Sequence, residues 1–294
     1  MPEVEILARH LRPLLRGKTI RSLSVSRERA TRPTPPREFE RALAGLKFRG
    51  LDRRGKYLVF QLEAPGFAGL RRGKRPGPGS ESGSSRLSVL GHLGMSGRMF
   101  IALKKEKLPK HAAVVFDLGD RNLIYEDRRY LGRMSLDLSP LKELGPEPPD
   151  FSVETFAAAL KGSRQPIKIK LLDQSVIAGV GNIYASEALF RARISPRLAA
   201  NQLTAAQAGD LLRAIREVLD RAVKFGSTVP LKTMSGESDA LFYFDDDGEG
   251  FYEKRLRVYD RAGEGCVNKC GATIERITQG GRSTYFCPRC QAKR

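Results

Sequence analysis

The spacing of apolar residues predicts a helix at the start of the chain and strands after it. From Val4 to Leu15 apolar side chains recur every three or four positions, as in an amphipathic helix, and Gly17 is a stop signal. Alternation of apolar and polar residues then predicts strands, with one short helix at 35–46. The strand segments are 20–27, 46–62 with a corner at 53–56, 86–103, 111–118 and 121–127. We therefore expect a β-rich N-terminal domain.

Helical periodicity replaces alternation in the second half of the chain. Before its last helix, Thr204 and Gln207 occupy the positions of a capping box, and Gly226 ends the run. The chain then closes with β-like hairpins around its cysteines. The expected helices are 153–162, 166–177, 182–194 and 204–226.

These patterns predict an α+β protein with several parts. Residues 64–86 are rich in Gly, Ser, Pro and Arg, and we expect a mobile basic insertion between strands there. The predicted parts are a β-rich domain with a helix at its start at 1–136, a linker at 137–152, a helical domain at 153–249 and a cysteine-containing segment at 250–294.

The charge balance favours a polyanionic partner. The chain has 52 basic and 33 acidic residues, a formal net charge of +19, and such a field attracts nucleic acid or, as the alternative, an anionic membrane surface. No apolar run reaches the length of about 18 residues that a membrane-spanning helix needs. Charged residues such as Glu3 and Glu5 stand where a signal peptide would have an apolar core. We expect a cytoplasmic monomer that binds nucleic acid.

The four cysteines predict one metal site. They form two close pairs, Cys266 with Cys270 and Cys287 with Cys290. Two such pairs on hairpin turns bring four thiolates to one tetrahedral ion, as structural Zn²⁺ prefers, whereas the alternative is a set of reduced, unliganded thiols. Arg276, Arg282 and Arg289 lie on the same hairpin and suggest that it binds phosphates.

Two further clusters point to phosphate binding. Gly179 and Gly181 permit a tight turn before Asn182, which we expect to cap a helix whose free amides would bind an anion. Arg164 and Lys168 upstream favour this over a purely structural helix pair.

The other cluster lies in the β domain and consists of RRGKYLVF (53–60), LGHLGMSGRMF (90–100) and EDRRYLGRM (126–134). In it Met95 is either a core residue or an apolar wedge for stacked bases, and Lys56 is either solvated or functional.

The start of the chain, MPEVE, has two interpretations. Pro2 either begins the first helix, where proline is tolerated, or becomes a terminal secondary amine beside Glu3 once Met1 is removed. An α-amine has a pKa near 8, so a useful neutral fraction exists at pH 7 without special burial.

In order along the chain, these segments resemble the formamidopyrimidine-DNA glycosylase family of bacterial base-excision repair enzymes. The resemblance rests on PEVE, RGKYL, HLGMSG, DRRYLGRM, LGPEP, PIKIKLLDQ, AGVGNIYASEALF and VYDRAGEGC…RSTYFCPRC. HLGMSG with RRGKYL is closer to this branch than to the endonuclease VIII branch. The resemblance implies a two-layer β-sandwich domain with flanking helices, then a helix–two-turn–helix domain that ends in a zinc-finger β-hairpin, with double-stranded DNA bound between them.

The resemblance also implies an activity and site residues. It implies a bifunctional enzyme that removes oxidised purines (8-oxoguanine and formamidopyrimidines) and cleaves the abasic strand by β,δ-elimination. The implied catalytic residues are Pro2 as Schiff-base nucleophile, Glu3 as acid/base, Lys56 and Arg282. The implied DNA contacts are His92, Arg164 and Asn182, with Lys168 in the same region, and Met95, Arg129 and either Leu131 or Tyr130 in the space left by the everted nucleotide. One structural Zn²⁺ and association with the bacterial nucleoid complete the expectation.

Four departures from the family pattern keep an alternative open. The chain reads MPEVE where the family has MPELPEVE, and its first cysteine pair is C-x3-C rather than C-x2-C. The family's wedge phenylalanine is replaced, and the loop at 228–247, in a region that shapes base recognition, differs. A non-catalytic damaged-DNA-binding protein on the same scaffold is therefore one alternative, and a plain zinc-finger DNA- or RNA-binding protein is another.

Overall fold

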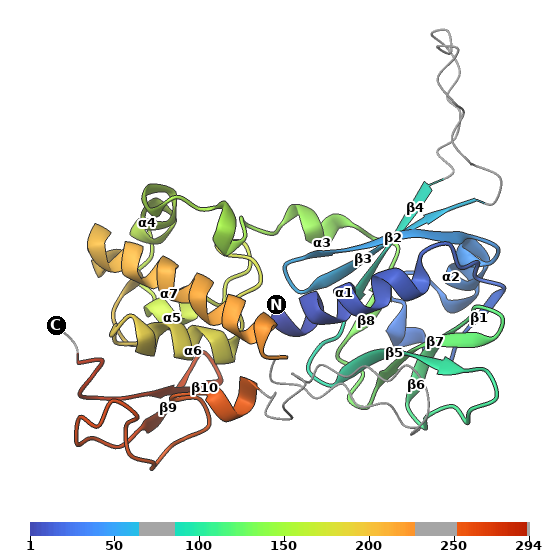
Figure 1. Ribbon diagram of the computed structural model, residues 1–294. Helices are drawn as coiled ribbons and strands as arrows, with labels where there is room; N and C mark the ends of the chain where they lie inside the picture. Colours follow the sequence, from blue (N-terminus) through green and yellow to red (C-terminus); the bar gives the residue numbers. More distant parts are fainter. Residues whose placement is uncertain (65–85, 227–251, 293–294) are drawn as a thin grey trace, which may run out of the picture. The chain divides into compact units, whose positions relative to one another are not determined.

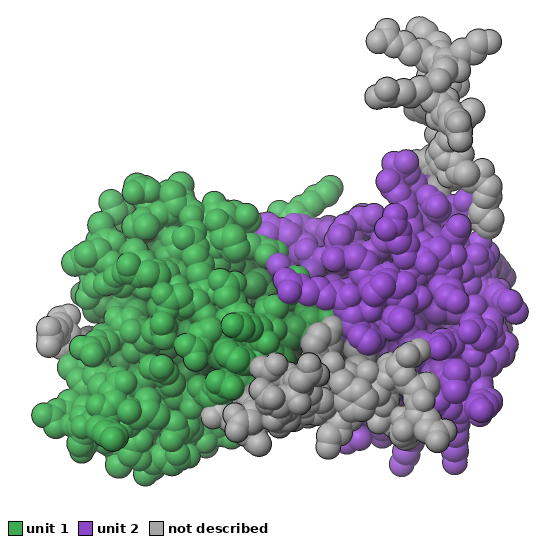
Figure 2. All heavy atoms as spheres, in the orientation of Figure 1, with its two compact units in different colours: residues 1–6, 142–230, 242–294 green, residues 7–141, 231–241 purple. Residues whose placement is uncertain are grey.

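The computed structural model describes residues 1–64, 86–226 and 252–292 (Figure 1). The predicted basic insertion, apart from residues 64 and 86, and the loop at 228–247 lie outside these residues. Contacts divide the described residues into two compact units: 1–6, 142–226 and 252–292 form unit 1, and 7–64 and 86–141 form unit 2 (Figure 2). This division follows contacts alone, so the domain limits predicted from the sequence stay predictions.

Unit 2 is a sandwich of two antiparallel sheets, which Figure 1 shows as separate layers. The first sheet has the order β2-β3-β4-β8, with β2 at Lys47–Arg54, β3 at Tyr57–Glu63, β4 at Arg86–His92 and β8 at Arg133–Ser135. The second has the order β1-β6-β7-β5, with β1 at Ser22–Val25, β5 at Gly97–Leu103, β6 at Ala112–Asp117 and β7 at Arg121–Asp127. The predicted β-sandwich is confirmed.

Aromatic residues join the two sheets of unit 2. The ring of Phe48 on β2 lies 6.0 Å from that of Phe60 and 6.4 Å from that of Phe116 on the other sheet. All three are nearly inaccessible to solvent, and burying one such side chain contributes about 1.5–3 kcal/mol to folding. Helix α1 (Pro2–Leu15) and helix α2 (Pro36–Leu43) add apolar side chains to the core, Leu11 and Phe39 among them.

Unit 1 consists of helices and one hairpin. Its main helices are α4 at Val153–Lys161, α5 at Ile167–Lys170, α6 at Asn182–Arg191 and α7 at Ala205–Lys224, and its hairpin pairs β9 at Glu275–Gln279 with β10 at Arg282–Phe286. The capping box predicted at the start of α7 is confirmed, because the Thr204 hydroxyl accepts from the Gln207 amide at 3.1 Å and the Gln207 side chain accepts from the Thr204 amide at 3.0 Å. Helices α6 and α7 contribute half of the buried residues of one apolar core.

Short helical elements complete the fold. The predicted linker contains α3 at Ser139–Lys142, and 3-10 helices occur at Glu28–Ala30, Pro148–Asp150, Ala200–Gln202 and Tyr252–Arg255. Among the described residues, no helix has the length and apolar character that crossing a membrane requires.

Three helix predictions were wrong at their boundaries. Asn182 is the first residue of α6 rather than its cap, which is Gly181. The segment 166–177 is helical only over α5, because the Asp173 carboxylate accepts from the Ser175 amide at 3.1 Å and turns the chain. Helix α6 ends at Arg191 rather than 194, since Arg193 adopts the left-handed conformation with φ of 56°.

Candidate active site and metal site

The site residues predicted from the sequence fall into two groups, one in each unit. Unit 1 contains Pro2, Glu3, Arg164, Lys168, Asn182, Arg282 and the four cysteines. Unit 2 contains Lys56, His92, Met95, Arg129, Tyr130 and Leu131.

The Glu3 carboxylate is held at the start of helix α1. The hydroxyl of Tyr184, a buried residue of α6, donates a hydrogen bond to one carboxylate oxygen of Glu3. The other oxygen lies 3.4 Å from the amino group of Met1. Pro2, between Met1 and Glu3, is buried and begins α1. A carboxylate that can exchange protons therefore lies beside the amino terminus.

Tyr184 is a site residue that sequence reasoning missed. Its only signal is its place in NIYASEALF, two positions after Asn182, and the pairing with Glu3 spans 181 residues of sequence.

The turn before α6 lies close to the amino terminus. Gly179 has φ of 92°, and a Cβ placed on it would lie only 2.7 Å from the Met1 sulfur. The left-handed backbone conformation favours glycine at this position. The glycine expected from the sequence to permit a tight turn thus also makes room for the first residue of the chain.

A hydrogen-bond cluster joins α5, α6 and β10. The side-chain amide of Asn182 donates to the Ser283 carbonyl at 3.0 Å and to the Tyr259 hydroxyl at 3.3 Å. The Lys168 ammonium donates to the same carbonyl of Ser283 at 3.4 Å. Asn182 thus holds the hairpin against the start of α6, and no side chain caps the first amides of that helix.

Positive charge gathers around this cluster. Arg282, the first residue of β10, is exposed, whereas the Lys168 side chain is buried. Burial and the nearby Arg282 charge lower the pKa of Lys168 to about 8. Arg164 is exposed in the turn before α5. Arg282 and Arg164 are therefore accessible to an anion, whereas the Lys168 ammonium donates to the backbone of the hairpin.

A buried carboxylate anchors the segment that leads to the hairpin. Glu187 of α6 is 3% exposed and accepts from the backbone amides of Arg257, Val258 and Tyr259, each at 2.9 Å. Burial raises the pKa of Glu187 although these three donors act in the opposite direction. Sequence reasoning gave Glu187 no role, because the segment it binds is 70 or more residues away.

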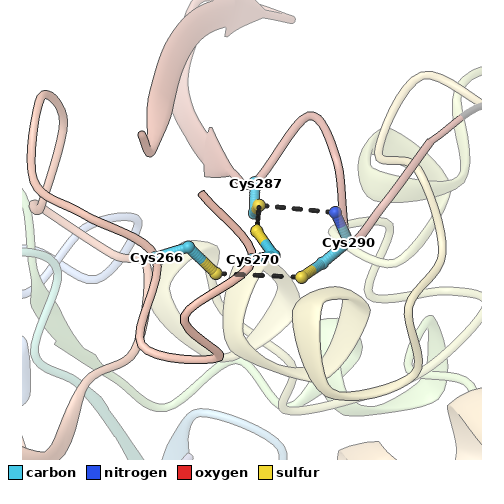
Figure 3. Close-up of side chains that lie close together, drawn as sticks. All are labelled: Cys266, Cys270, Cys287 and Cys290. Carbon is cyan, nitrogen blue, oxygen red and sulfur yellow. Dashed lines mark hydrogen bonds between the residues drawn. The ribbon is translucent and has the colours of Figure 1, made fainter. Parts of the chain in front are cut away.

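The four cysteines converge on one point (Figure 3). Their sulfur atoms all lie within 4.8 Å of one another, with Cys266 to Cys290 at 3.8 Å and Cys270 to Cys287 at 3.5 Å. In a tetrahedral site with metal–sulfur bonds of about 2.3 Å, neighbouring sulfur atoms are about 3.8 Å apart. The cysteines therefore fit a four-coordinate thiolate site, and the predicted metal-binding cluster is confirmed.

His92 in unit 2 is neutral. Its Nδ1 atom accepts from the Gly94 amide at 3.1 Å, and its ring lies 5.0 Å from that of Tyr57. Burial lowers the pKa of His92 to about 4, and the charges of Lys56 and Arg133 act in the same direction. The hydrogen is therefore assigned to Nε2, which is a neutral donor. Lys56 lies in the two-residue turn between β2 and β3.

The candidate wedge residues differ in exposure. Met95 is 67% exposed and Leu131 is 44% exposed, and Arg129 is exposed as well. Tyr130 is half-buried, and the guanidinium of Arg27 lies 5.5 Å from the centre of its ring.

Family models match most of the chain in three consecutive parts. Residues 1–134 match the formamidopyrimidine-DNA glycosylase N-terminal domain, and residues 144–233 match the formamidopyrimidine-DNA glycosylase H2TH domain. Residues 263–293 match the zinc finger found in FPG and IleRS.

Individual relatives are similar over nearly their whole length. The formamidopyrimidine-DNA glycosylase of Chloroflexus aurantiacus is 38% identical over 300 residues, covering 99% of this chain and 96% of the relative. That of Carboxydothermus hydrogenoformans is 34% identical over 293 residues, covering 99% and 98%. A solved complex between Lactococcus lactis Fpg and DNA with an abasic site matches with a TM-score of 0.81 and 31% identity, covering 100% of this chain and 99% of the other. A structure of MutM with DNA containing carbocyclic 8-oxo-G matches with a TM-score of 0.80 and 32% identity, covering 100% and 99%.

Proposed function

The chain belongs to the formamidopyrimidine-DNA glycosylase family, and on this premise we propose that it excises oxidised purines, 8-oxoguanine and formamidopyrimidines, from duplex DNA and cleaves the resulting abasic strand. Solved relatives hold DNA with an abasic site or an 8-oxoguanine analogue, which supports this substrate class. The observation that carries the proposal is the Glu3 carboxylate, held by Tyr184 one residue from Pro2. The match to the family's N-terminal domain also disfavours a plain zinc-finger protein.

Pro2 is the proposed nucleophile. Removal of Met1 would make its nitrogen a secondary amine with a pKa near 8. The amine attacks C1′ of the everted nucleotide and the bond from C1′ to the base breaks. The bond from C1′ to the ring oxygen O4′ then opens, which leaves an iminium ion on the Pro2 nitrogen, while Glu3 transfers the protons. The iminium ion then acidifies the C2′ proton, and loss of that proton breaks the C3′–oxygen bond. A second elimination breaks the C5′–oxygen bond.

The remaining site residues are proposed to hold the DNA. Lys56 and Arg282 are assigned to the phosphates beside the reacting sugar, where Arg282 aids the second elimination. His92, Arg164, Lys168 and Asn182 are assigned to the backbone-binding region, as the family resemblance implies. Arginine and lysine on a protein of net charge +19 favour phosphate contacts, which position the duplex without reading its sequence.

The metal is proposed to be one Zn²⁺ with a structural role. Four thiolates at tetrahedral spacing leave no open coordination position, so the ion would hold the hairpin and take no part in bond breaking. The proposed working form is a monomer bound to duplex DNA in the bacterial nucleoid.

Borohydride trapping tests the proposal. Duplex DNA with one 8-oxoguanine is incubated with the protein and sodium borohydride, and the cross-linked peptide is identified by mass spectrometry. The expected adduct lies on the nitrogen of Pro2. As a matched control, a variant with alanine inserted between Met1 and Pro2 moves the terminal amine by one residue, and we expect it to lose trapping but keep DNA binding. Equal trapping by both proteins would refute the assignment of Pro2.

A non-catalytic damaged-DNA-binding protein remains the second candidate. Pro2 is buried in the first turn of α1, so its amine would have little freedom to reach a sugar. Tight binding to the lesion duplex, with neither cross-link nor strand cleavage, would establish this candidate in place of the enzyme.

A further inference from the structure

Two loops of unit 2 lie side by side where the chain passes between its two sheets. Residues 93–96 lead from β4 to β5, and residues 128–132 lead from β7 to β8 (Figure 1). Both ends of the loops are tied by strand pairing, since His92 pairs with Arg133 in one sheet and Gly97 pairs with Asp127 in the other. The loops therefore cross between the same two pairs of strands in opposite chain directions. Each carries one exposed apolar side chain, Met95 or Leu131.

A single buried carboxylate binds both loops. Asp127 is 1% exposed, and its oxygens accept from the Ser96 hydroxyl at 2.6 Å in the first loop. In the second loop they accept from the amides of Arg129 at 3.1 Å and Gly132 at 2.8 Å. Tyr125 adds a fourth donor at 3.2 Å. Burial acts to raise the pKa of Asp127, but these hydrogen bonds outweigh it and hold the pKa below its ordinary value, so the carboxylate stays charged.

The backbones of the two loops are in direct contact. A Cβ placed on Gly94, which has φ of 64°, would lie 2.6 Å from the Gly132 nitrogen. A Cβ placed on Gly132 would lie 2.3 Å from the His92 carbonyl oxygen. No side chain fits between the loops, so they cannot shift independently without losing this packing.

The backbone conformation and contacts of Tyr130 indicate a different role from that of its neighbour Leu131. Its φ of 52° is a left-handed conformation that a bulky residue rarely adopts. Its ring lies against Arg27, and its hydroxyl is 3.5 Å from the His111 ring nitrogen. The strained backbone turns Tyr130 onto the body of unit 2 and leaves Leu131 exposed.

We propose that Asp127 is a positioning residue that presents Met95 and Leu131 as one rigid apolar projection, and that Leu131, rather than Tyr130, enters the base stack beside an everted nucleotide. The inference rests on the proposed function, because it needs a duplex whose target base leaves the stack. An apolar wedge can separate stacked bases only if the loops that carry it keep their position. A buried carboxylate that binds both loops restricts their movement.

Substitution of the two candidate wedges separates them. We expect Leu131→Ala to slow single-turnover excision of 8-oxoguanine by about tenfold, because the space left by the base is no longer filled. Leu108→Ala is the matched control, since Leu108 is an equally exposed leucine of unit 2 (45%) outside both loops. If Tyr130→Leu slowed excision while Leu131→Ala was no slower than Leu108→Ala, the choice of Leu131 would be overturned.

A double-mutant cycle tests Asp127. Asp127→Asn keeps the size of the side chain but removes its charge, and we expect it to slow excision by about tenfold in the wild-type background and by less than about twofold in the Leu131→Ala background. A merely structural role would give the same factor in both backgrounds, which would contradict the proposal. Asp117→Asn is the matched control, because Asp117 likewise accepts a turn amide, that of Gly119 at 2.8 Å, outside the two loops.

A binding measurement separates this inference from the proposed chemistry. The fluorescence of 2-aminopurine placed beside the lesion rises when the bases unstack, which precedes any bond breaking. If the wild-type protein unstacks the duplex without excising the base, the proposed catalysis fails, and the loss of this signal in Leu131→Ala and Asp127→Asn still supports the inference. Unchanged signals in both variants would contradict it.

Discussion

At the scale of single residues, His92 shows how local contacts determine a protonation state. The Gly94 amide occupies Nδ1, and burial with two nearby cationic side chains opposes a second proton. A neutral imidazole can donate from Nε2 to a phosphate, but it adds no charge to the attraction of DNA. The proposed contact of His92 with the DNA backbone is therefore a directed hydrogen bond.

The low pKa of His92 predicts how stability depends on pH. Between about 6.5, the pKa of an unperturbed histidine, and about 4, the unfolded chain binds a proton that the folded protein excludes, so stability falls as the pH falls through this window. His92→Asn retains an acceptor for the Gly94 amide but does not titrate there. We expect the loss of unfolding free energy between pH 7 and pH 5, measured by urea denaturation, to be smaller in this variant. Equal losses in the two proteins would contradict the low pKa.

Residues with chemistry of their own could be predicted from the sequence, whereas positioning residues could not. The metal cluster follows from the cysteine spacing, and the structure confirms the cluster. Local pattern left Met95 open between a core residue and an exposed wedge, and the structure places its side chain in solvent. Tyr184, Glu187 and Asp127 act through contacts with side chains or amides elsewhere in the chain. A tyrosine or a carboxylate has many possible partners, and only the fold selects one.

At the scale of elements, the metal hairpin is the part that depends most on a ligand. Its strands β9 and β10 are each five residues long, and an isolated two-stranded hairpin is at best marginally stable in water. The small core behind it consists mainly of Phe190, Val258, Ile274 and Tyr285 with two of the cysteines. The free energy of metal binding must therefore supply much of the stability of this element.

Removal of the metal should weaken DNA binding without unfolding unit 2. We expect elemental analysis to find one Zn²⁺ per reduced chain, and Cys287→Ser to lose it. The variant should bind lesion duplex at least about tenfold more weakly, because Arg282 at the start of β10 is no longer held in place. Near-normal thermal unfolding of the β-sandwich would serve as the control, and tight binding by a zinc-free variant would count against the idea.

Sequence patterns predicted which elements exist better than where they end. Every predicted strand of unit 2 is present, because alternation reflects one buried face, as in β3 with Leu58, Phe60 and Leu62 inside. The limits of α5 and α6 were wrong because a side-chain turn at Asp173 and a left-handed residue at Arg193 decide them. Strand β8, three residues long, was too short for any period to show.

At the scale of the whole molecule, the net charge of +19 makes DNA affinity depend on salt. Each phosphate contact releases counterions, so the logarithm of the affinity should fall linearly with the logarithm of salt concentration. We expect Arg282→Ala to reduce this slope by about one unit. Arg213→Ala removes the same charge from an exposed arginine that already pairs with Asp210 on α7, and it should leave the slope unchanged. A flat salt dependence of the wild-type protein would refute the phosphate-binding picture.

Family membership was the feature of the whole chain that could be predicted most directly. No single motif carried it, because PEVE or RGKYL alone is short enough to occur by chance. The order of the motifs along the chain did indicate the family, and the matches over residues 1–134, 144–233 and 263–293 confirm the family membership. Lesion preference did not follow, because it depends on the shape of a pocket.

Because Glu187 binds the amides of residues 257–259, the metal hairpin can unfold locally while the segment that leads into it stays bound to helix α6. These amides are held by α6 and not by the metal, so they should open only together with the helical core, whereas β9 and β10 open when the ion leaves. Metal-depleted molecules would then stay largely folded. The cysteine-bearing segment beyond residue 259 would remain attached to helix α6 through residues 257–259. Reloading the ion would need only the closure of loops within this segment, and not the folding of the helical core. The protein should therefore survive a temporary shortage of metal and recover quickly when the supply returns.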